Sequence, residues 1–283
     1  MTNDPAAPAA SGPGGVTPPG PYQSVPSAER SPRPSTGGPV TLPDDLVEAA
    51  GTLFGDRLPL AAAYAELLAT EGVVRGLIGP REAPRIWDRH LLNCAAVAEL
   101  IPTGARVVDV GSGAGLPGLV LAVARPDLSV VLVEPLARRT AFLDEAVDRL
   151  GLDGTVTVQR GRAEEFADAD FSPADVVTAR AVAPLDRLAG WCLPLAAVGG
   201  RLVALKGNSA PDEVAEHRDA VDRLGGGAPV VRHCGVGLVD PPTTVVEIVR
   251  EREIVSARSR SARRTAARPG SGANAGRKRA RRG

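Results

Sequence analysis

The stretch Val107-Val108-Asp109-Val110-Gly111-Ser112-Gly113-Ala114-Gly115-Leu116-Pro117-Gly118 decides the fold of this chain. Its first four residues, three valines and Asp109, form a mostly apolar run that is typical of a buried strand. The glycines that follow allow positive φ angles and let a ligand approach without a Cβ in the way. Open α/β sheets bind ligands at such turns, at the carboxyl ends of their strands. We therefore expect a ligand site beside Gly111 and Gly113.

Short apolar runs alternate with segments of helical spacing from Arg106 onward. This alternation predicts a doubly wound, Rossmann-like α/β sheet, mostly parallel and covered on both faces. Two further runs, joined through Asp240-Pro241-Pro242, predict an antiparallel hairpin at one edge. The expected strands are 106–110, 129–134, 155–159, 175–179 and 201–206, the helices are 117–125, 137–150 and 184–197, and the hairpin strands are 229–234 and 243–250.

The chain divides into four parts. Residues 1–41 are rich in proline and glycine and too poor in large apolar side chains to fold, so we expect them to be disordered. Residues 42–104 contain three stretches of helical apolar spacing (44–54, 57–72 and 84–100) and predict a small helical cap. Residues 105–254 carry the sheet domain. Residues 255–283 form a basic tail, also expected to be disordered.

Composition indicates the compartment and the kind of partner that we expect for the protein. The three cysteines are too scattered for a disulfide framework or a zinc site, so we expect no metal and buried, reduced thiols in a cytoplasmic protein. The sequence shows no signal peptide and no run of 18 apolar residues, which predicts no membrane association. The tail carries ten basic side chains and no acidic one, so acidic residues outnumber basic ones in the rest of the chain. The tail is either a polyanion-seeking arm or a solubiliser.

The glycine turn permits two kinds of ligand, or is a structural turn that binds none. Gly113, Gly115 and Gly118 satisfy the G-x-G-x-x-G pattern of dinucleotide-binding folds, and Glu134 ends the next strand where it could accept hydrogen bonds from ribose hydroxyls. Asp109 extends the pattern to D-x-G-x-G-x-G, in register with the strand end. We expect Asp109 to stay ionised and to accept hydrogen bonds from amides of the loop.

Two further turns favour S-adenosylmethionine over a dinucleotide. The third expected strand leads into the polar turn Gly161-Arg162-Ala163-Glu164, well placed beside an adenine. Gly199-Gly200 precedes the fifth strand, as is usual in methyltransferases. The residues thus predict a class I S-adenosylmethionine-dependent methyltransferase, with hydride transfer as the less favoured reading.

A specific family resemblance accompanies these motifs. The glycine stretch, with its Leu-Pro-Gly extension, resembles the signature of the RsmG family, also called glucose-inhibited division protein B. The matches run in order over residues 75–207: Arg89-His90-Leu91-Leu92, Arg138-Arg139 followed by Phe142-Leu143, Gly161-Arg162-Ala163-Glu164, Arg180-Ala181-Val182-Ala183-Pro184-Leu185 and Ala204-Leu205-Lys206-Gly207.

The resemblance implies methylation of guanine N7 in the 530 loop of 16S ribosomal RNA, at guanine 527 in the usual bacterial numbering. The substrate would be the RNA itself, a precursor particle or the 30S subunit. The chain departs from the family at Gly76-Leu77-Ile78 and at Asn93-Cys94, both in or near the cap. By the family pattern, and with Gly113 and Glu134 added from the motif, the expected cofactor contacts are Gly111, Gly113, Leu116, Glu134, Ala163, Glu164 and Arg180.

Guanine N7 has a free lone pair and no proton to lose, so we expect no catalytic residue and a mechanism of positioning. Arg162, Arg180 and Lys206 are the candidates on the substrate side, with Arg180 facing either the cofactor carboxylate or an RNA phosphate. Each has an ordinary alternative, such as a structural salt bridge for Lys206.

The remaining polar and aromatic residues carry simpler expectations. We expect His90 to bond within the cap, Trp87 and Trp191 to lie in the core, and Arg138 and Arg139 either to contact RNA or to pair with Asp144 or Glu145. Two rival functions remain: an RNA-binding protein without activity, which would not need a cofactor pocket, and a small-molecule methyltransferase, which would act without RNA.

Overall fold

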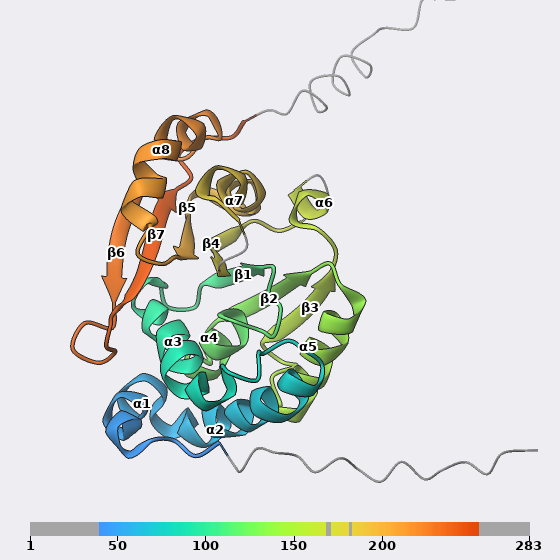
Figure 1. Cartoon of the computed structure of the whole chain (residues 1–283). Coiled ribbons are helices and arrows are strands. Elements are labelled where there is room, and N and C mark those ends of the chain that lie inside the picture. The colour runs from blue at the N-terminus through green and yellow to red at the C-terminus, as the bar shows by residue number, and fades with distance from the viewer. Residues whose placement is uncertain (1–39, 168–170, 181–182, 255–283) are drawn as a thin grey trace, which may run out of the picture. The chain divides into compact units, whose positions relative to one another are not determined.

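The computed structural model describes residues 40–167, 171–180 and 183–254. The expectations for the proline-rich segment and the basic tail therefore lie outside the described residues, apart from residues 40 and 41. A seven-stranded sheet in the order β3-β2-β1-β4-β5-β7-β6 forms the centre of the fold (Figure 1). Its strands are β1 (Arg106–Val110), β2 (Ser129–Glu134), β3 (Val156–Arg160), β4 (Ala174–Arg180), β5 (Ala196–Leu205), β6 (Val230–Cys234) and β7 (Thr243–Val249).

The first five strands run parallel, whereas β7 pairs antiparallel with both β5 and β6. This order, with an antiparallel last strand pair, is the class I S-adenosylmethionine-dependent methyltransferase fold, and the predicted fold class is confirmed. Because β1 lies between β2 and β4, the chain reverses its direction of winding there. The crevice of such a sheet opens at the carboxyl end of β1.

The predicted turn at Gly199-Gly200 is wrong in its placement. Both glycines lie inside β5, where the register with β4 shifts between Ala174 and Val176. Gly199 has a φ of 86°, and a Cβ on Gly200 would lie 2.9 Å from the carbonyl oxygens of Ala174 and Asp175. The two glycines therefore form an irregularity within one long strand, because only glycine fits this conformation so close to the neighbouring backbone.

Alternate residues of the central strands point into two separate cores. In β2, Val130 and Leu132 belong to one cluster of buried side chains, and Val131 and Val133 belong to the other. The first face is covered by α4 (Gly118–Ala124) and α5 (Ala137–Arg149), with the N-terminal helices beyond them. The second is covered by α6 (Ala163–Ala167), α7 (Leu185–Cys192) with the turn η7 (Leu193–Leu195), and α8 (Ala210–Arg223) (Figure 1).

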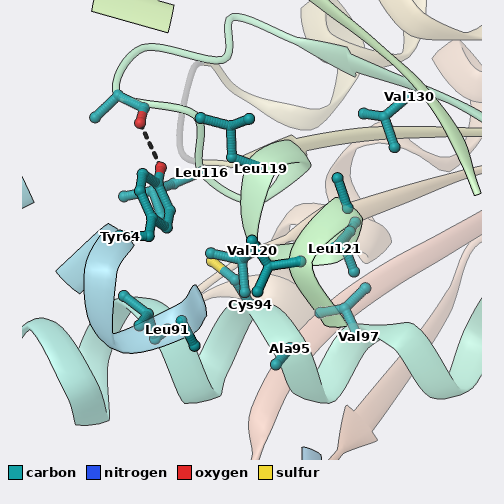
Figure 2. Packing of buried hydrophobic residues seen from close by; sticks show 14 of the residues in the cluster. Tyr64, Leu91, Cys94, Ala95, Val97, Leu116, Leu119, Val120, Leu121 and Val130 are labelled. Atoms are coloured by element: carbon teal, nitrogen blue, oxygen red, sulfur yellow. Dashed lines mark hydrogen bonds between the residues drawn. The ribbon is translucent and has the colours of Figure 1, made fainter. Parts of the chain in front are cut away.

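The expected cap consists of short helical pieces rather than three continuous helices. Buried side chains of these pieces, such as Tyr64 and Leu91, share one core with Leu119 and Leu121 of α4 (Figure 2). The pieces are η1 (Asp44–Leu46), α1 (Val47–Phe54), η2 (Gly55–Arg57), α2 (Leu58–Leu67), the π-helical turn η3 (Leu68–Gly72), η4 (Ala83–Arg85), the π-helical turn η5 (Ile86–Leu92), α3 (Asn93–Ala96) and η6 (Val97–Leu100).

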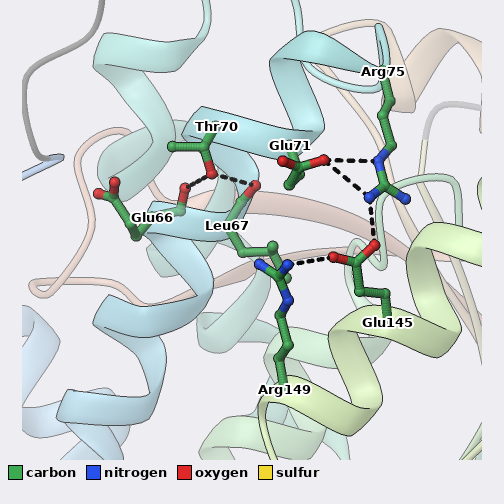
Figure 3. Close-up of polar contacts among 7 residues, drawn as sticks. All are labelled: Glu66, Leu67, Thr70, Glu71, Arg75, Glu145 and Arg149. Atoms are coloured by element: carbon green, nitrogen blue, oxygen red, sulfur yellow. Dashed lines mark hydrogen bonds and ion pairs between the residues drawn. The ribbon is translucent and has the colours of Figure 1, made fainter. Parts of the chain in front are cut away.

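Ion pairs connect this helical region to α5. Arg75 contacts Glu71 on its own segment and Glu145 on α5, and Glu145 also pairs with Arg149 (Figure 3). The Arg75 guanidinium additionally lies 5.6 Å from the centre of the Phe142 ring. These contacts fix the face of α5 that the cap covers.

The predicted burial of the cysteines is confirmed. Cys94, Cys192 and Cys234 are free and buried, and burial raises the pKa of each thiol, to about 11 for Cys94 and about 12 for Cys234. Among the described residues, no helix is long and apolar enough to cross a membrane.

Candidate functional site

The glycine loop follows β1 and is held from two sides. Gly111, Gly113 and Gly115 have φ angles of 71°, 59° and 93°, which glycine adopts at little cost. The Gly111 amide donates a hydrogen bond of 2.8 Å to the carbonyl of Val133 in β2. On the opposite side the buried Tyr64 hydroxyl donates to the Ala114 carbonyl at 2.5 Å (Figure 2). The loop conformation is therefore held by hydrogen bonds from the protein itself.

Asp109 lies fully buried beneath this loop. Its carboxylate accepts hydrogen bonds from the Gly118 amide at 3.0 Å and from the Thr178 hydroxyl at 3.3 Å. Burial raises the pKa of Asp109 to about 6, and these hydrogen bonds lower it in part. The carboxylate is therefore mostly ionised at neutral pH, and the amide that it holds is the first of α4.

Glu134 forms the floor of a pocket of about 310 Å³ at the carboxyl ends of β1 and β2. Its side chain is 1% exposed and accepts hydrogen bonds from the amides of Gly113 and Leu136, each at 3.0 Å. Each carboxylate oxygen has a second lone pair, so acceptor capacity remains for a ligand. The volume is at the lower end of the range of about 300–1,000 Å³ for small-molecule sites.

Most of the expected cofactor residues lie around this pocket. Leu116 does not line it, because its side chain is buried in the core beside Tyr64 and the cap (Figure 2). Arg180 lines a second cavity instead. Gly113 does not line the smaller pocket either, although its amide bonds Glu134. The expected cofactor residues in the lining are Gly111, Glu134, Ala163 and Glu164. The lining also includes Arg162, which we expected on the substrate side, and Arg139 and Trp191, which we did not expect there.

A second cavity, of about 1090 Å³, opens at the carboxyl ends of β4 and β5. Arg180 and Lys206 both line it, as predicted from their positions at strand ends, whereas Arg162 does not. His90 and Asn93 reach the same cavity from the cap. The structure thus brings together residues that lie more than 100 positions apart in the sequence.

Lys206 is held in a salt bridge. Its side chain is 6% exposed, and its ammonium group donates to the Ala183 carbonyl at 2.8 Å and to the Glu213 carboxylate at 2.7 Å. Although partial burial raises the pKa of Glu213, the Lys206 ammonium lowers it below its usual value. The structural salt bridge that we considered as the alternative for Lys206 is therefore what the geometry shows.

Arg180 donates from its Nη1 atom to Nδ1 of His90 at 2.8 Å. The prediction that His90 bonds within the cap is wrong, because its partner is the last residue of β4. His90 is 9% exposed, and burial, followed by the charge of Arg180, lowers its pKa to about 4. The imidazole is therefore neutral at physiological pH.

Two other side chains differ in part from what we expected. Arg139 pairs with neither Asp144 nor Glu145, because its guanidinium lies 3.6 Å from Glu134 at the smaller pocket, and its contact with RNA stays a prediction. Trp191 is half-buried at that pocket, with Arg187 5.3 Å from the centre of its ring, whereas Trp87 is buried in the core as predicted. The prediction for Trp191 is therefore right only in part, because its side chain packs against the second core and also forms part of the pocket wall.

Within the described part of the chain, no three His, Cys, Asp or Glu side chains are grouped to hold a metal ion. The candidate site thus consists of the glycine loop and two cavities. The smaller has a buried carboxylate at its floor, and the larger has a basic wall at the end of β4.

Comparison with known proteins places these features in one family. A family model described as rRNA small subunit methyltransferase G matches residues 57–237. Ribosomal RNA small subunit methyltransferase G of Salinispora tropica is 72% identical over 229 residues, covering 80% of this chain and 95% of that protein. The proteins of the same name from Thermobifida fusca (55% identical) and Corynebacterium efficiens (52% identical) each have 97% of their length matched, over 82% and 81% of this chain.

Proposed function

This chain belongs to the rRNA small subunit methyltransferase G family, and we propose on that basis that it transfers a methyl group from S-adenosylmethionine to guanine N7 in 16S ribosomal RNA. The modified nucleotide is guanine 527 in the usual bacterial numbering, in the 530 loop. The observation that carries the proposal is the family match over residues 57–237. This range contains the glycine loop, the smaller pocket and most of the wall of the larger cavity.

S-adenosylmethionine fits the smaller pocket by its chemistry. The lone pairs that remain on Glu134 suit the two hydroxyls of a ribose, and Ala163 and Glu164 lie where the adenine would be held. Gly111 and Gly113 present backbone without a Cβ, and Leu116 would contribute its backbone alone. The cofactor supplies a sulfonium methyl group that a nucleophile can take directly.

Arg180 and Lys206 act by position in this proposal. Arg180 offers a charged donor to an anion at the end of β4, either the cofactor carboxylate or an RNA phosphate. Lys206 holds the Ala183 carbonyl and α8 in place, which shapes the wall against which the guanine would lie. Arg162, at the smaller pocket, is a candidate for RNA contact. Because neutral N7 carries no proton, no side chain needs to act as a base.

The RNA partner accounts for the charge of the tail. Ten basic side chains follow residue 254 and no acidic one, so we propose that the tail is an auxiliary contact to 16S RNA, as part of the 30S subunit or a precursor. A small-molecule methyltransferase would have no use for such an arm.

Methyl transfer with labelled S-adenosylmethionine tests the proposal. The full chain should label 16S RNA or 30S particles from a strain that lacks this modification, and should not label particles that are already modified. Digestion should place the label in N7-methylguanosine. Label in a small molecule without RNA, or cofactor binding with no transfer to any form of the RNA, would contradict the proposed function.

A further inference from the structure

Arg180 is oriented by a neutral side chain rather than by a carboxylate. Its Nη1 atom lies 2.8 Å from Nδ1 of His90, and both residues line the larger cavity. Within the described ranges, no Asp or Glu oxygen lies at ion-pair distance from Arg180. The neighbouring Lys206, in contrast, is paired with Glu213 at 2.7 Å.

The chemistry of the two groups fixes the tautomer of His90. A guanidinium group donates hydrogen bonds and cannot accept them, so Nδ1 of His90 must accept and the ring proton must lie on Nε2. That Nε2 atom is buried without a hydrogen-bond partner among the described residues, and the Glu82 carboxylate lies 3.5 Å away. The lowered pKa of His90 agrees with a ring that stays neutral.

A neutral acceptor and a carboxylate would have different effects on Arg180. A carboxylate would orient the guanidinium but would also cancel most of its charge, as Glu213 does for Lys206. The imidazole orients the guanidinium without forming an ion pair with it, and the buried Asp109 carboxylate acts on Arg180 only from beyond ion-pair distance, so the charge can still serve a third group. A residue at the end of β4, at the wall of a cavity, is well placed to use that charge on a ligand.

We propose that His90 is a positioning residue, whose neutral imidazole fixes the Arg180 guanidinium for an anionic group of the reactants without cancelling its charge. The inference rests on the proposed function. The anion is either the carboxylate of the cofactor or a phosphate of the RNA, and both present oxygen atoms that accept guanidinium hydrogen bonds.

Three substitutions of His90 separate orientation from charge. His90→Gln keeps a neutral acceptor and should retain kcat/KM on the RNA within about threefold. His90→Phe removes the acceptor, and His90→Glu keeps an acceptor but cancels the charge; each should lower kcat/KM at least tenfold. If the anion is the cofactor carboxylate, His90→Phe should raise the Kd for S-adenosylmethionine. If it is an RNA phosphate, that Kd should stay unchanged and the KM for RNA should rise.

A double-mutant cycle tests whether His90 acts through Arg180. In a chain that carries Arg180→Gln, the further change His90→Phe should cost less than twofold, because the guanidinium that it positions is gone. A full tenfold cost in that background, or a His90→Phe chain as active as the wild type, would overturn the proposal. Thermal unfolding of each variant checks that it folds. If His90→Phe does not fold, the ratio of His90→Gln to His90→Glu carries the test.

Nitrogen NMR distinguishes this inference from the proposed function. The chain has only three histidines, so the ring signals of His90 can be assigned by substitution. We expect Nδ1 of His90 to be unprotonated from about pH 5.5 to 8. A protonated Nδ1 would refute the inference even if the RNA is methylated. An unprotonated Nδ1 in a chain that methylates no RNA would refute the proposed function instead, and the positioning role with it.

Discussion

Asp109 and His90 are two buried titratable residues whose pKa values shift in opposite directions. Burial raises the pKa of Asp109 to about 6 and lowers that of His90 to about 4. In both cases burial disfavours the charged form, which is the carboxylate of Asp109 and the imidazolium of His90. Their contributions to the pH dependence of stability must therefore differ in sign.

The Asp109 contribution should fall as the pH rises. Between about pH 4 and 6 the folded protein keeps a proton that the unfolded chain has released, so the free energy of unfolding decreases through this window by about 3 kcal/mol in total. Asp109→Asn removes this cost of a buried charge. We therefore expect Asp109→Asn to be stabilised relative to the wild type more strongly at pH 7 than at pH 4, when the free energies of unfolding of both are measured in urea.

His90→Gln provides the control with the opposite sign. As the pH falls from about 6.5 to 4, the unfolded chain takes up a proton on His90 before the folded protein does, so wild-type stability is lost in that direction. The free energy of unfolding of His90→Gln should therefore exceed that of the wild type at pH 4 by more than it does at pH 7. If the stability of both variants relative to the wild type changed with pH in the same direction, the burial of either Asp109 or His90 would be contradicted.

Gly111 tests the cofactor pocket at a single residue. Its φ of 71° and its place in the pocket lining mean that Gly111→Val introduces a strained backbone and two methyl groups against the ligand. We expect the Kd for S-adenosylmethionine, measured by calorimetry, to rise at least tenfold. Gly76→Val is a matched control, because Gly76 has a φ of 67° with open space around it. An equal loss of affinity in both variants would show that strain alone, and not the pocket, is responsible.

The site residues differ in how far the sequence could predict them. Gly111, Glu134 and Ala163 follow from strand ends, because parallel strands bring their carboxyl ends to one edge. The partners of Arg180 and Lys206 did not follow in this way. His90 lies 90 residues from Arg180 in a helical region whose packing no local pattern fixes.

Among the secondary structure elements, α8 was the one large helix that we did not predict. Only Ala210 and Val221 of its residues are buried, and half of its side chains are Asp, Glu or Arg, so its apolar stripe is narrow and easily missed. The pattern fails for a second reason in the cap, where π-helical and 3-10 turns interrupt the helices and shift the buried face. The strands of the sheet were predicted to within a residue or two, apart from the start of β5, because the central ones are continuous apolar runs buried on both faces.

The Lys206–Glu213 salt bridge should attach α8 to the end of β5. Lys206→Met keeps most of the apolar stem but leaves the Glu213 carboxylate and the Ala183 carbonyl without their donor. We expect the free energy of unfolding in urea to fall by about 2–3 kcal/mol, since the partly buried pair is broken from one side. Adding Glu213→Gln should restore part of the loss.

An exposed pair on the cap serves as the comparison for this prediction. Arg85 and Asp88 are 2.7 Å apart with side chains that are 49% and 38% exposed. Arg85→Met should therefore change the free energy of unfolding by less than about 1 kcal/mol. Equal effects of Arg85→Met and Lys206→Met would mean that burial does not strengthen the Lys206 pair.

For the molecule as a whole, the N-terminal helices and the sheet domain share one hydrophobic core. Tyr64 bonds the glycine loop, His90 bonds the end of β4, and the buried residues around them share one cluster with α4 (Figure 2). The division at residue 105 stays a prediction. These contacts connect the N-terminal helices to both cavities. We therefore expect substitutions in the helices to affect methyl transfer.

The basic tail makes a prediction about RNA affinity. If several of its ten basic side chains contact phosphates, the logarithm of the RNA affinity should fall with the logarithm of salt concentration by about 0.7–0.9 per contact. A chain that ends at Val255 should show a shallower slope, with its affinity for S-adenosylmethionine unchanged. A full-length chain with the ten residues replaced by Gln controls for length. Equal slopes for all three would make the tail a solubiliser.

The central claim concerns one atom of one nucleotide, and mass spectrometry of 16S RNA tests it most directly. The chain would be produced in a bacterium that lacks its own methyltransferase of this family, and the RNA digested. We predict N7-methylguanosine at guanine 527 with the wild-type chain and unmodified guanine with the Gly111→Val chain. A methyl group at another nucleotide or another atom, or unmodified guanine 527 with the wild-type chain present, would contradict the account.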